Sequence, residues 1–262
     1  MRTAQPFRAI LATTVLSFGA SCGDPAETEP PPSDGVTYSG TITQAVLGTP
    51  IAGAQICIAE PPGDCVVTAS DGSYSLPDIP KSQRVEIQVT ADNFVSALGV
   101  FEIKDVDRED INASLFDELI VTGLFTDAGF NLDLTQGTIG ISLYDSDVAH
   151  GASGYELSLS PSEGEGPVYA STTQVLPDGT ETTDGGGGVF FNLPEGEYTV
   201  TAAGPGECTT PAIASDGPLS WPARVRPGFL TYIFAQCPDG SDGGGGAGGA
   251  GGEGGTGGTG GV

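Results

Sequence analysis

The chain has 262 residues, with 34 Asp and Glu against 8 Lys and Arg, which gives a net charge of −26 at neutral pH. Arg2 and Arg8 precede residue 22 and every acidic residue follows it, so the chain beyond residue 22 carries a net charge of −28. A surface this acidic repels phosphate groups, which argues against nucleic-acid binding and against electrostatic docking on anionic membranes. Solubility outside the cytoplasm accounts for the charge, and weak calcium binding by clustered carboxylates is the alternative.

Residues 1–21 are predicted to be a signal peptide. Arg8 precedes a mostly apolar run of ten residues from Ala9 to Phe18, and small residues follow this run. The run is too short to cross a bilayer, which requires about 20 apolar residues. We therefore expect the mature protein to be exported.

The segment Gly19-Ala20-Ser21-Cys22-Gly23 resembles a bacterial lipobox, although Gly19 stands where that family has an aliphatic residue. The resemblance implies that Cys22 is lipidated, that the membrane is a partner through this anchor, and that the protein is an outer-membrane or cell-surface lipoprotein. Ordinary cleavage nearby, with Cys22 left as a free thiol, is the alternative. Residues 22–35 are acidic and rich in Pro, which predicts an extended linker.

Residues 36–116 predict a first β-sandwich of about seven short strands. The alternation of Val85, Ile87 and Val89 with polar residues is typical of a strand with one face in the core. Asp71-Gly72 marks a tight turn between strands, because Gly tolerates the positive φ that such turns require.

Several segments of this region resemble the carboxypeptidase regulatory-like domain. They are Gly40-Thr41-Ile42, Pro50 to Ile56, Thr68 to Leu76, and Ile79-Pro80, with Phe94 at the end of a later strand. The resemblance implies a transthyretin-like (prealbumin-like, Ig-like) sandwich. It also implies a structural or binding appendage without catalytic residues.

Residues 117–136 predict a linker with a short helix, since apolar residues from Leu119 to Phe125 recur at roughly helical spacing and Gly129 can end a helix. A strand is the alternative. Residues 137–238 predict a second, diverged sandwich, because the run from Val189 to Val200 is similar to a segment of the same family. The fold class is therefore all-β, with two tandem sandwiches. Residues 239–262 are rich in Gly and predict a disordered tail.

The five cysteines divide into one single thiol and two pairs. With Cys22 as the lipid site, Cys57 can pair with Cys65 across a turn-rich loop, and Cys208 can pair with Cys237 within the second half. A zinc site is disfavoured, because the chain has one His and no C-x-x-C motif.

The residues that catalysis uses are scarce. His150 is the only His and lies among small residues, and no G-x-S-x-G motif is present, so we expect no enzyme and no cofactor. Weak calcium candidates are Asp145, Asp147, Asp178 and Asp184, which stand in two predicted loops with Thr180 and Thr182. Solvated loops are the alternative.

The function predicted from these patterns is a non-catalytic lipoprotein of the cell envelope, acting as a structural or protein-interaction module. The alternative is a module that binds carbohydrate or cell wall, with Trp221 as a weak candidate for stacking on the ligand. Trp221 as part of the core is the other interpretation of that residue. The expected partner is thus an unknown protein or glycan.

Overall fold

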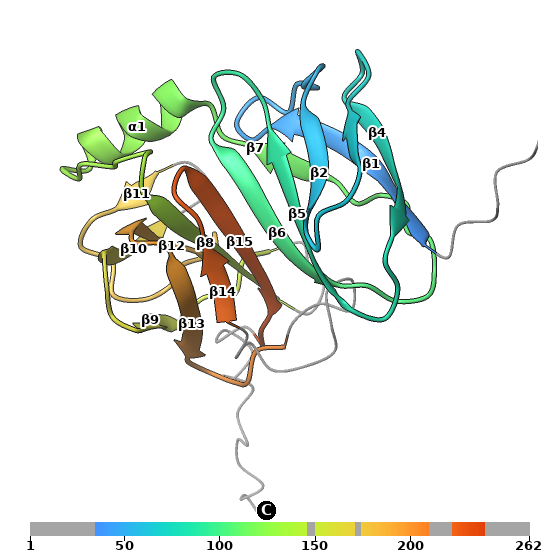
Figure 1. The fold of residues 1–262 in the computed structure, drawn as a ribbon. Helices are drawn as coiled ribbons and strands as arrows, with labels where there is room; N and C mark the ends of the chain where they lie inside the picture. Colours follow the sequence, from blue (N-terminus) through green and yellow to red (C-terminus); the bar gives the residue numbers. More distant parts are fainter. Residues whose placement is uncertain (1–34, 146–149, 171–173, 210–221, 239–262) are drawn as a thin grey trace, which may run out of the picture. The chain divides into compact units, whose positions relative to one another are not determined.

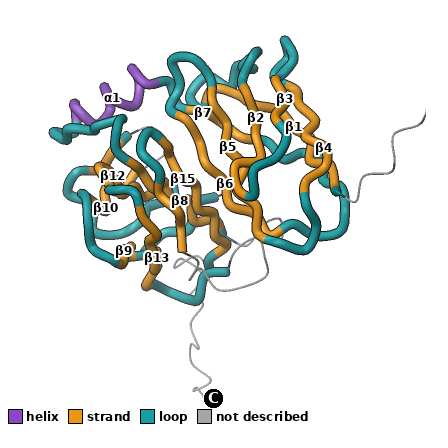
Figure 2. The backbone as a smooth tube through the Cα atoms, viewed as in Figure 1, coloured by secondary structure: helices purple, strands orange, loops and turns teal. Residues whose placement is uncertain are grey.

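The computed structural model of the chain describes residues 35–145, 150–170, 174–209 and 222–238. Within these ranges the chain forms fifteen strands and one helix (Figures 1 and 2). The elements of the first half are β1 (Val36–Gln44), β2 (Gln55–Glu60), β3 (Cys65–Val67), β4 (Ser73–Ile79), β5 (Arg84–Thr90), β6 (Ser96–Glu102) and β7 (Ala113–Leu115). Those of the second half are α1 (Glu118–Asp127), β8 (Gly137–Tyr144), β9 (Glu156–Ser160), β10 (Glu165–Ala170), β11 (Val175–Leu176), β12 (Gly187–Leu193), β13 (Gly196–Ala203), β14 (Pro222–Val225) and β15 (Phe229–Gln236). The predicted all-β class with two sandwiches is confirmed.

The first sandwich packs a three-stranded sheet, β4-β1-β7, against strands β6-β5-β2-β3. Val85, Ile87 and Val89 all face its core, as their alternation predicts. Gly72, which the sequence places in a tight turn, adopts a positive φ of +76°, and Gly53 also adopts a positive φ, +78°. Burial of one apolar face from each sheet stabilises this half.

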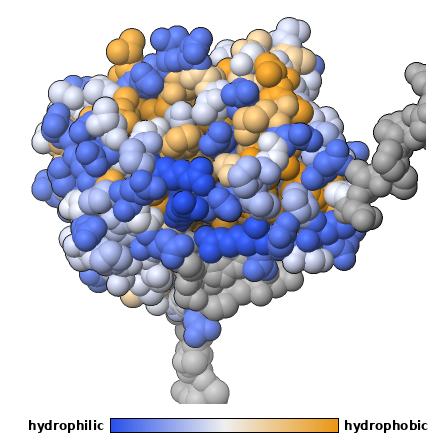
Figure 3. Space-filling view, in the orientation of Figure 1, coloured by the Kyte–Doolittle hydropathy of each residue, from blue (hydrophilic) through white to orange (hydrophobic). Residues whose placement is uncertain are grey.

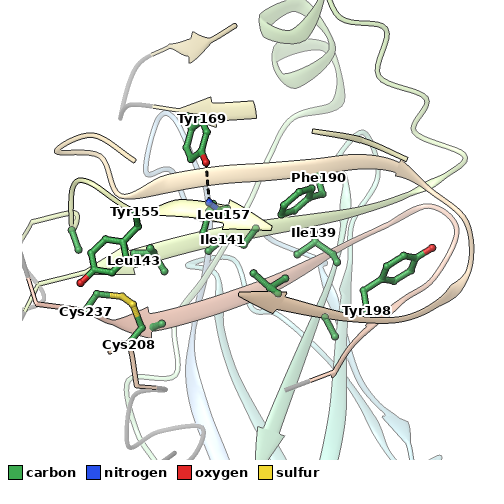
Figure 4. Packing of buried hydrophobic residues seen from close by; sticks show 14 of the residues in the cluster. Ile139, Ile141, Leu143, Tyr155, Leu157, Tyr169, Phe190, Tyr198, Cys208 and Cys237 are labelled. Carbon is green, nitrogen blue, oxygen red and sulfur yellow. Dashed lines mark hydrogen bonds between the residues drawn. A yellow bond between two sulfur atoms is a disulfide. The ribbon is translucent and has the colours of Figure 1, made fainter. Parts of the chain in front are cut away.

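The second sandwich packs β14-β13-β9 against strands β8, β12 and β15. Its core contains Ile139, Ile141 and Leu143 from β8, with Tyr155 and Leu157 from the region of β9 (Figure 4). The Tyr169 hydroxyl accepts a hydrogen bond from the Leu157 backbone N–H at 2.9 Å, which satisfies a buried donor.

One nine-stranded sheet runs through both sandwiches, in the order β11-β10-β12-β8-β15-β6-β5-β2-β3. The connection is made by β15, which pairs in parallel with β8 on one side and with β6 on the other. The two sandwiches accordingly belong to one compact unit. Backbone hydrogen bonds between β6 and β15 hold them together in addition to side-chain contacts.

The two cores lie on opposite faces of this shared sheet (Figure 1). Tyr232 stands beside Gly99 in the β15–β6 pairing and packs against the first core, whereas Ile233, the next residue, packs against the second. Successive side chains of a strand point to opposite faces, so one strand contributes to both cores. The Tyr232 hydroxyl also donates a hydrogen bond to the Ser114 carbonyl of β7 at 3.1 Å.

Glu86 of β5 contributes to the same junction on the face of the shared sheet opposite to the first core. The alternation in β5 predicts a solvent-facing position, but Glu86 is only 5% exposed. Arg226 donates a hydrogen bond to its carboxylate at 2.6 Å, and Arg224 of β14 lies 3.9 Å away. A buried carboxylate needs such a partner, since desolvation of an unpaired charge is costly. The prediction missed this because the partner lies 140 residues further along the chain.

Both halves contain the same arrangement of one buried threonine. The Thr68 hydroxyl donates to the Ile51 carbonyl at 2.7 Å and accepts from the Ala54 N–H at 2.9 Å. In the second half the Thr182 hydroxyl donates to the Ala152 carbonyl at 2.8 Å and accepts from the Tyr155 N–H at 3.1 Å. We refer to each arrangement as a threonine lock.

The backbone around each threonine lock also repeats. Ile42 receives a hydrogen bond from Ile51 and donates one to Gly72, and Leu143 does the same with Ala152 and Gly186. The strands that contain Ile42 and Leu143 also pair alike. The first, β1, pairs antiparallel with β4 and parallel with β7, and the second, β8, pairs antiparallel with β12 and parallel with β15. The shared hydrogen bonds and strand register therefore make Ile42 of the first half equivalent to Leu143 of the second.

The predicted helix is confirmed as α1. Asp117 caps its start by accepting hydrogen bonds from the N–H groups of Leu119 and Ile120. Gly129, with φ +87°, follows its end, as the sequence indicates. Phe125 packs on Phe191 with ring centroids 5.0 Å apart, so the helix covers β10 and β12 on the outer face of the shared sheet.

Candidate functional site

Three aromatic side chains form a row on the outer face of β8 and β15. Tyr144 and Phe234 have nearly parallel rings, 17° apart with centroids at 6.3 Å, and the rings of Phe234 and Tyr232 are 10° apart with centroids at 5.7 Å. We call this set the aromatic row. It lies on the face of the shared sheet opposite to β14, because Tyr232 packs toward the first core and β14 covers the second.

The register of the strands explains why the Phe234 ring stays accessible. Tyr232 pairs with Gly140 and Phe234 pairs with Ser142, so no large side chain of β8 stands directly beside these two rings. Phe234 remains 42% exposed, which makes it one of the few large apolar side chains at the surface of the described residues. Tyr232 is more enclosed, and burial raises the pKa of its hydroxyl.

The equivalent face of the first sandwich is polar. With Ile42 equivalent to Leu143, the strand register makes Thr43 equivalent to Tyr144, and Asn112, the residue before Ala113, equivalent to Phe234. The side-chain amide oxygen of Asn112, Oδ1, accepts hydrogen bonds from the backbone N–H and from the hydroxyl of Thr41, both at 2.8 Å. The same sheet position thus carries a solvated amide in one half and an exposed aromatic ring in the other.

The part of the sequence that forms most of the second half is rich in carboxylates. Between Glu109 and Ala223 the sequence has 18 acidic residues and neither Lys nor Arg. The two arginines of the second half, Arg224 and Arg226, both approach Glu86 at the junction. Figure 3 shows mostly hydrophilic side chains where β9, β13 and β14 lie in Figure 1, which is the side of the shared sheet opposite to the aromatic row.

Both predicted disulfides are present. Cys57 and Cys65 are direct partners in the β2–β3 pairing. Cys208 and Cys237 join the segment after β13 to the end of β15, beside Tyr155 and Leu143 (Figure 4). The second bridge holds the strand that carries Tyr232 and Phe234.

The calcium prediction stays a prediction. Among the residues that the structure describes, no group of three or more His, Cys, Asp and Glu is placed to hold a metal ion. Asp145 lies 3.5 Å from the His150 imidazole, while Asp178 and Asp184 are exposed. The Thr182 hydroxyl is engaged in the threonine lock, and Asp147 lies outside the described residues.

Two other predicted positions, Cys22 and Trp221, also lie outside the described residues, as do the signal peptide, most of the linker and the Gly-rich tail. No helix of the described part of the chain is long and apolar enough to cross a membrane.

Sequence reasoning missed the aromatic row. The available signal was the segment Phe229 to Ala235, in which both faces of the predicted strand carry apolar residues. Such a run indicates a strand covered on both sides, yet Phe234 remains exposed. Only the pairing with β8 reveals that Tyr144 joins the same row.

One family model matches the first half of the chain. The family model of the carboxypeptidase regulatory-like domain matches residues 37–115. This match covers the whole of the first sandwich and agrees with its transthyretin-like fold. No match was found among curated proteins.

Several solved structures are similar at low identity. The Bacillus anthracis TIE protein is 12% identical with a TM-score of 0.27, over 77% of this chain and 34% of that protein. GBS52, the minor pilin of the gram-positive pathogen Streptococcus agalactiae, is 11% identical with a TM-score of 0.25, over 77% of this chain and 95% of that one. BcpA, the major pilin subunit of Bacillus cereus, is 10% identical with a TM-score of 0.23, over 77% and 99%. With TM-scores this low, none of these similarities supports a conclusion about function.

Proposed function

We propose that the protein is a non-catalytic structural and protein-interaction module of the cell envelope, anchored by a lipid on Cys22. The observation that carries the proposal is the junction between the sandwiches, where β6 and β15 pair and Glu86 meets Arg226. A continuous sheet with a buried ion pair fixes the relative orientation of the two sandwiches. A fixed pair of sandwiches suits a scaffold that presents one surface at a set position.

The match of residues 37–115 to the carboxypeptidase regulatory-like domain supports the non-catalytic part of this proposal, because that resemblance implies an appendage without catalytic residues. We further propose that the second sandwich is a diverged second copy of the same domain. The repeated threonine lock, at Thr68 and Thr182, supports this relationship.

The test of the anchor is mass spectrometry of the mature N-terminus, isolated from membranes of cells that express the full chain. We expect a diacylated or triacylated Cys22 as the first residue and a soluble product from the Cys22→Ser variant. An unmodified N-terminus in the soluble fraction would contradict the anchor.

The test of the interaction role uses the same preparation. Crosslinking on intact cells, followed by mass spectrometry, is expected to recover one reproducible protein partner at surface residues of the sandwiches. Crosslinks confined to the chain itself, or to no consistent protein, would contradict the interaction role and leave the anchor to be judged separately.

A further inference from the structure

The comparison between the two halves isolates Tyr144 and Phe234 as side chains that the shared strand pairing does not require. The first sandwich forms the same strand pairing with Thr43 and Asn112 at the positions of Tyr144 and Phe234. Phe234 is 42% exposed, so its ring gains little from burial within the chain. An exposed ring beside two nearly parallel neighbours offers a flat apolar surface to a partner.

The net charge of the second half indicates the chemistry of that partner. The 115 residues from Glu109 to Ala223 include 18 carboxylates and no Lys or Arg, and the two arginines that follow approach Glu86. The surface of the second sandwich therefore attracts cations and repels anions. A cationic group that also stacks on aromatic rings satisfies both features, and the arginine guanidinium is such a group.

We propose that the aromatic row, formed by Tyr144, Phe234 and Tyr232, is a docking surface for a basic, arginine-containing segment of a partner protein. This inference rests on the proposed interaction role and specifies the chemistry of the partner. A guanidinium group stacks on the exposed ring of Phe234 at the centre of the row, with the half-buried Tyr144 beside it. Carboxylates of the second sandwich supply the long-range attraction that brings the segment to the sheet.

The test uses the full mature chain and a labelled synthetic peptide of alternating Arg and Ser, with binding measured by fluorescence anisotropy. The matched variants place the residues of the first sandwich in the second, Phe234→Asn and Tyr144→Thr, which the equivalent strands of the first half accommodate. Leu119→Ser is the control, since Leu119 is an 85% exposed apolar residue of α1 that is not part of the row. Circular dichroism verifies that each variant is folded.

We expect the Phe234→Asn variant to weaken binding at least tenfold, Tyr144→Thr several-fold, and Leu119→Ser not at all. A peptide with Lys in place of Arg is expected to bind several-fold more weakly, because its ammonium groups stack less well on rings. Higher salt is expected to weaken binding of both peptides.

Equal affinity of wild type and Phe234→Asn for the arginine peptide would overturn the proposal, because the attraction would then be independent of the row. Absence of peptide binding, together with Phe234-dependent binding of neutral oligosaccharides, would overturn it in favour of a glycan ligand. Neither result depends on the lipid on Cys22, so failure of this inference is separable from failure of the proposed anchor.

Discussion

The two sandwiches repeat the same buried framework and differ at the surface. Each contains a threonine lock. In each half the backbone near the lock also makes the same hydrogen bonds with one residue of a core strand, Ile42 of β1 or Leu143 of β8. On the outer face of the equivalent strands, however, Thr43 and Asn112 of the first half are replaced by Tyr144 and Phe234 of the second. The repeated positions are those that satisfy buried polar groups, whereas the differing positions face solvent.

The difference also extends to how each half is completed. The first sandwich uses β6 as the outer strand of one sheet, and the second supplies β15 to pair with it. The second sandwich has β10, β11 and α1 in addition, inserted or attached around the common framework. The repeated core therefore determines the fold of each half, and the added elements determine how the halves join.

The largest effect is expected from breaking the junction. The Glu86→Ala variant leaves the Arg226 guanidinium, whose side chain is 20% exposed, without its carboxylate. We expect a loss of about 3–5 kcal/mol in the free energy of unfolding, since loss of one partner of a buried pair leaves an uncompensated charge. Urea denaturation should also change from one transition to two, as the sandwiches unfold separately.

The control for this experiment is Glu109→Ala, which removes an exposed carboxylate of the first half. That variant is expected to change the free energy of unfolding by less than about 0.5 kcal/mol. A single transition of unchanged midpoint for Glu86→Ala would show that the junction contributes nothing to coupling between the halves.

The disulfides provide the next comparison, one in each half. Cys57 and Cys65 are separated by 8 residues, and Cys208 and Cys237 by 29. Replacement of both cysteines by serine is expected to cost about 2.5 kcal/mol in the first half and about 3.5 kcal/mol in the second, because the longer loop gains more entropy when opened. Guanidinium chloride denaturation of each double variant measures the difference, and a larger loss in the first half would contradict the loop-length argument.

The threonine locks test whether the halves are energetically as well as geometrically equivalent. Thr68→Val and Thr182→Val each remove a hydroxyl that satisfies one buried N–H and one buried carbonyl. We expect each variant to lose about 2 kcal/mol in the free energy of unfolding, since buried polar groups are left without partners. Urea denaturation measures the loss.

Serine variants at the same two positions retain the hydroxyl and serve as matched controls. Thr68→Ser and Thr182→Ser are expected to lose less than the valine variants. Serine losses as large as those of valine would assign the stabilisation to the methyl group and not to the hydrogen bonds.

The sequence predicts the framework well because its signals are local. Alternation in residues 85–90, the turn at Asp71-Gly72 and the helix end at Gly129 each depend on neighbours in the chain, and each is confirmed. The family resemblance over the first half adds the sandwich fold, which the match to residues 37–115 confirms.

The features that escape prediction depend on distant pairing. Glu86 has the spacing of a solvent-facing residue, and its burial results from arginines about 140 residues away. The aromatic row combines β8 with β15, and 84 residues separate the end of β8 at Tyr144 from the start of β15 at Phe229. Strand register determines which side chains share a face, and periodicity within one strand does not contain that information.

The smallest expected effect concerns one buried tyrosine in each half. The Tyr74 hydroxyl donates to the Ile111 carbonyl at 2.6 Å, and burial raises its pKa to about 12. Burial, followed by a hydrogen bond to Glu163, raises the pKa of Tyr198 to about 12 as well. A folded-state pKa above the unfolded value near 10 favours folding at low pH, and this contribution is lost as pH rises through 12.

The free energy of unfolding should therefore be insensitive to these two groups up to about pH 10 and should fall between about pH 10 and 12. Urea denaturation across this range, for wild type and for Tyr74→Phe, Tyr198→Phe and the double variant, measures the slope. Each single variant is expected to reduce the alkaline loss by a part, because Tyr38, Tyr169 and Tyr232 also have raised pKa values. Equal reductions from the two single variants would extend the equivalence of the sandwiches to their electrostatics, and a reduction from only one would limit it to geometry.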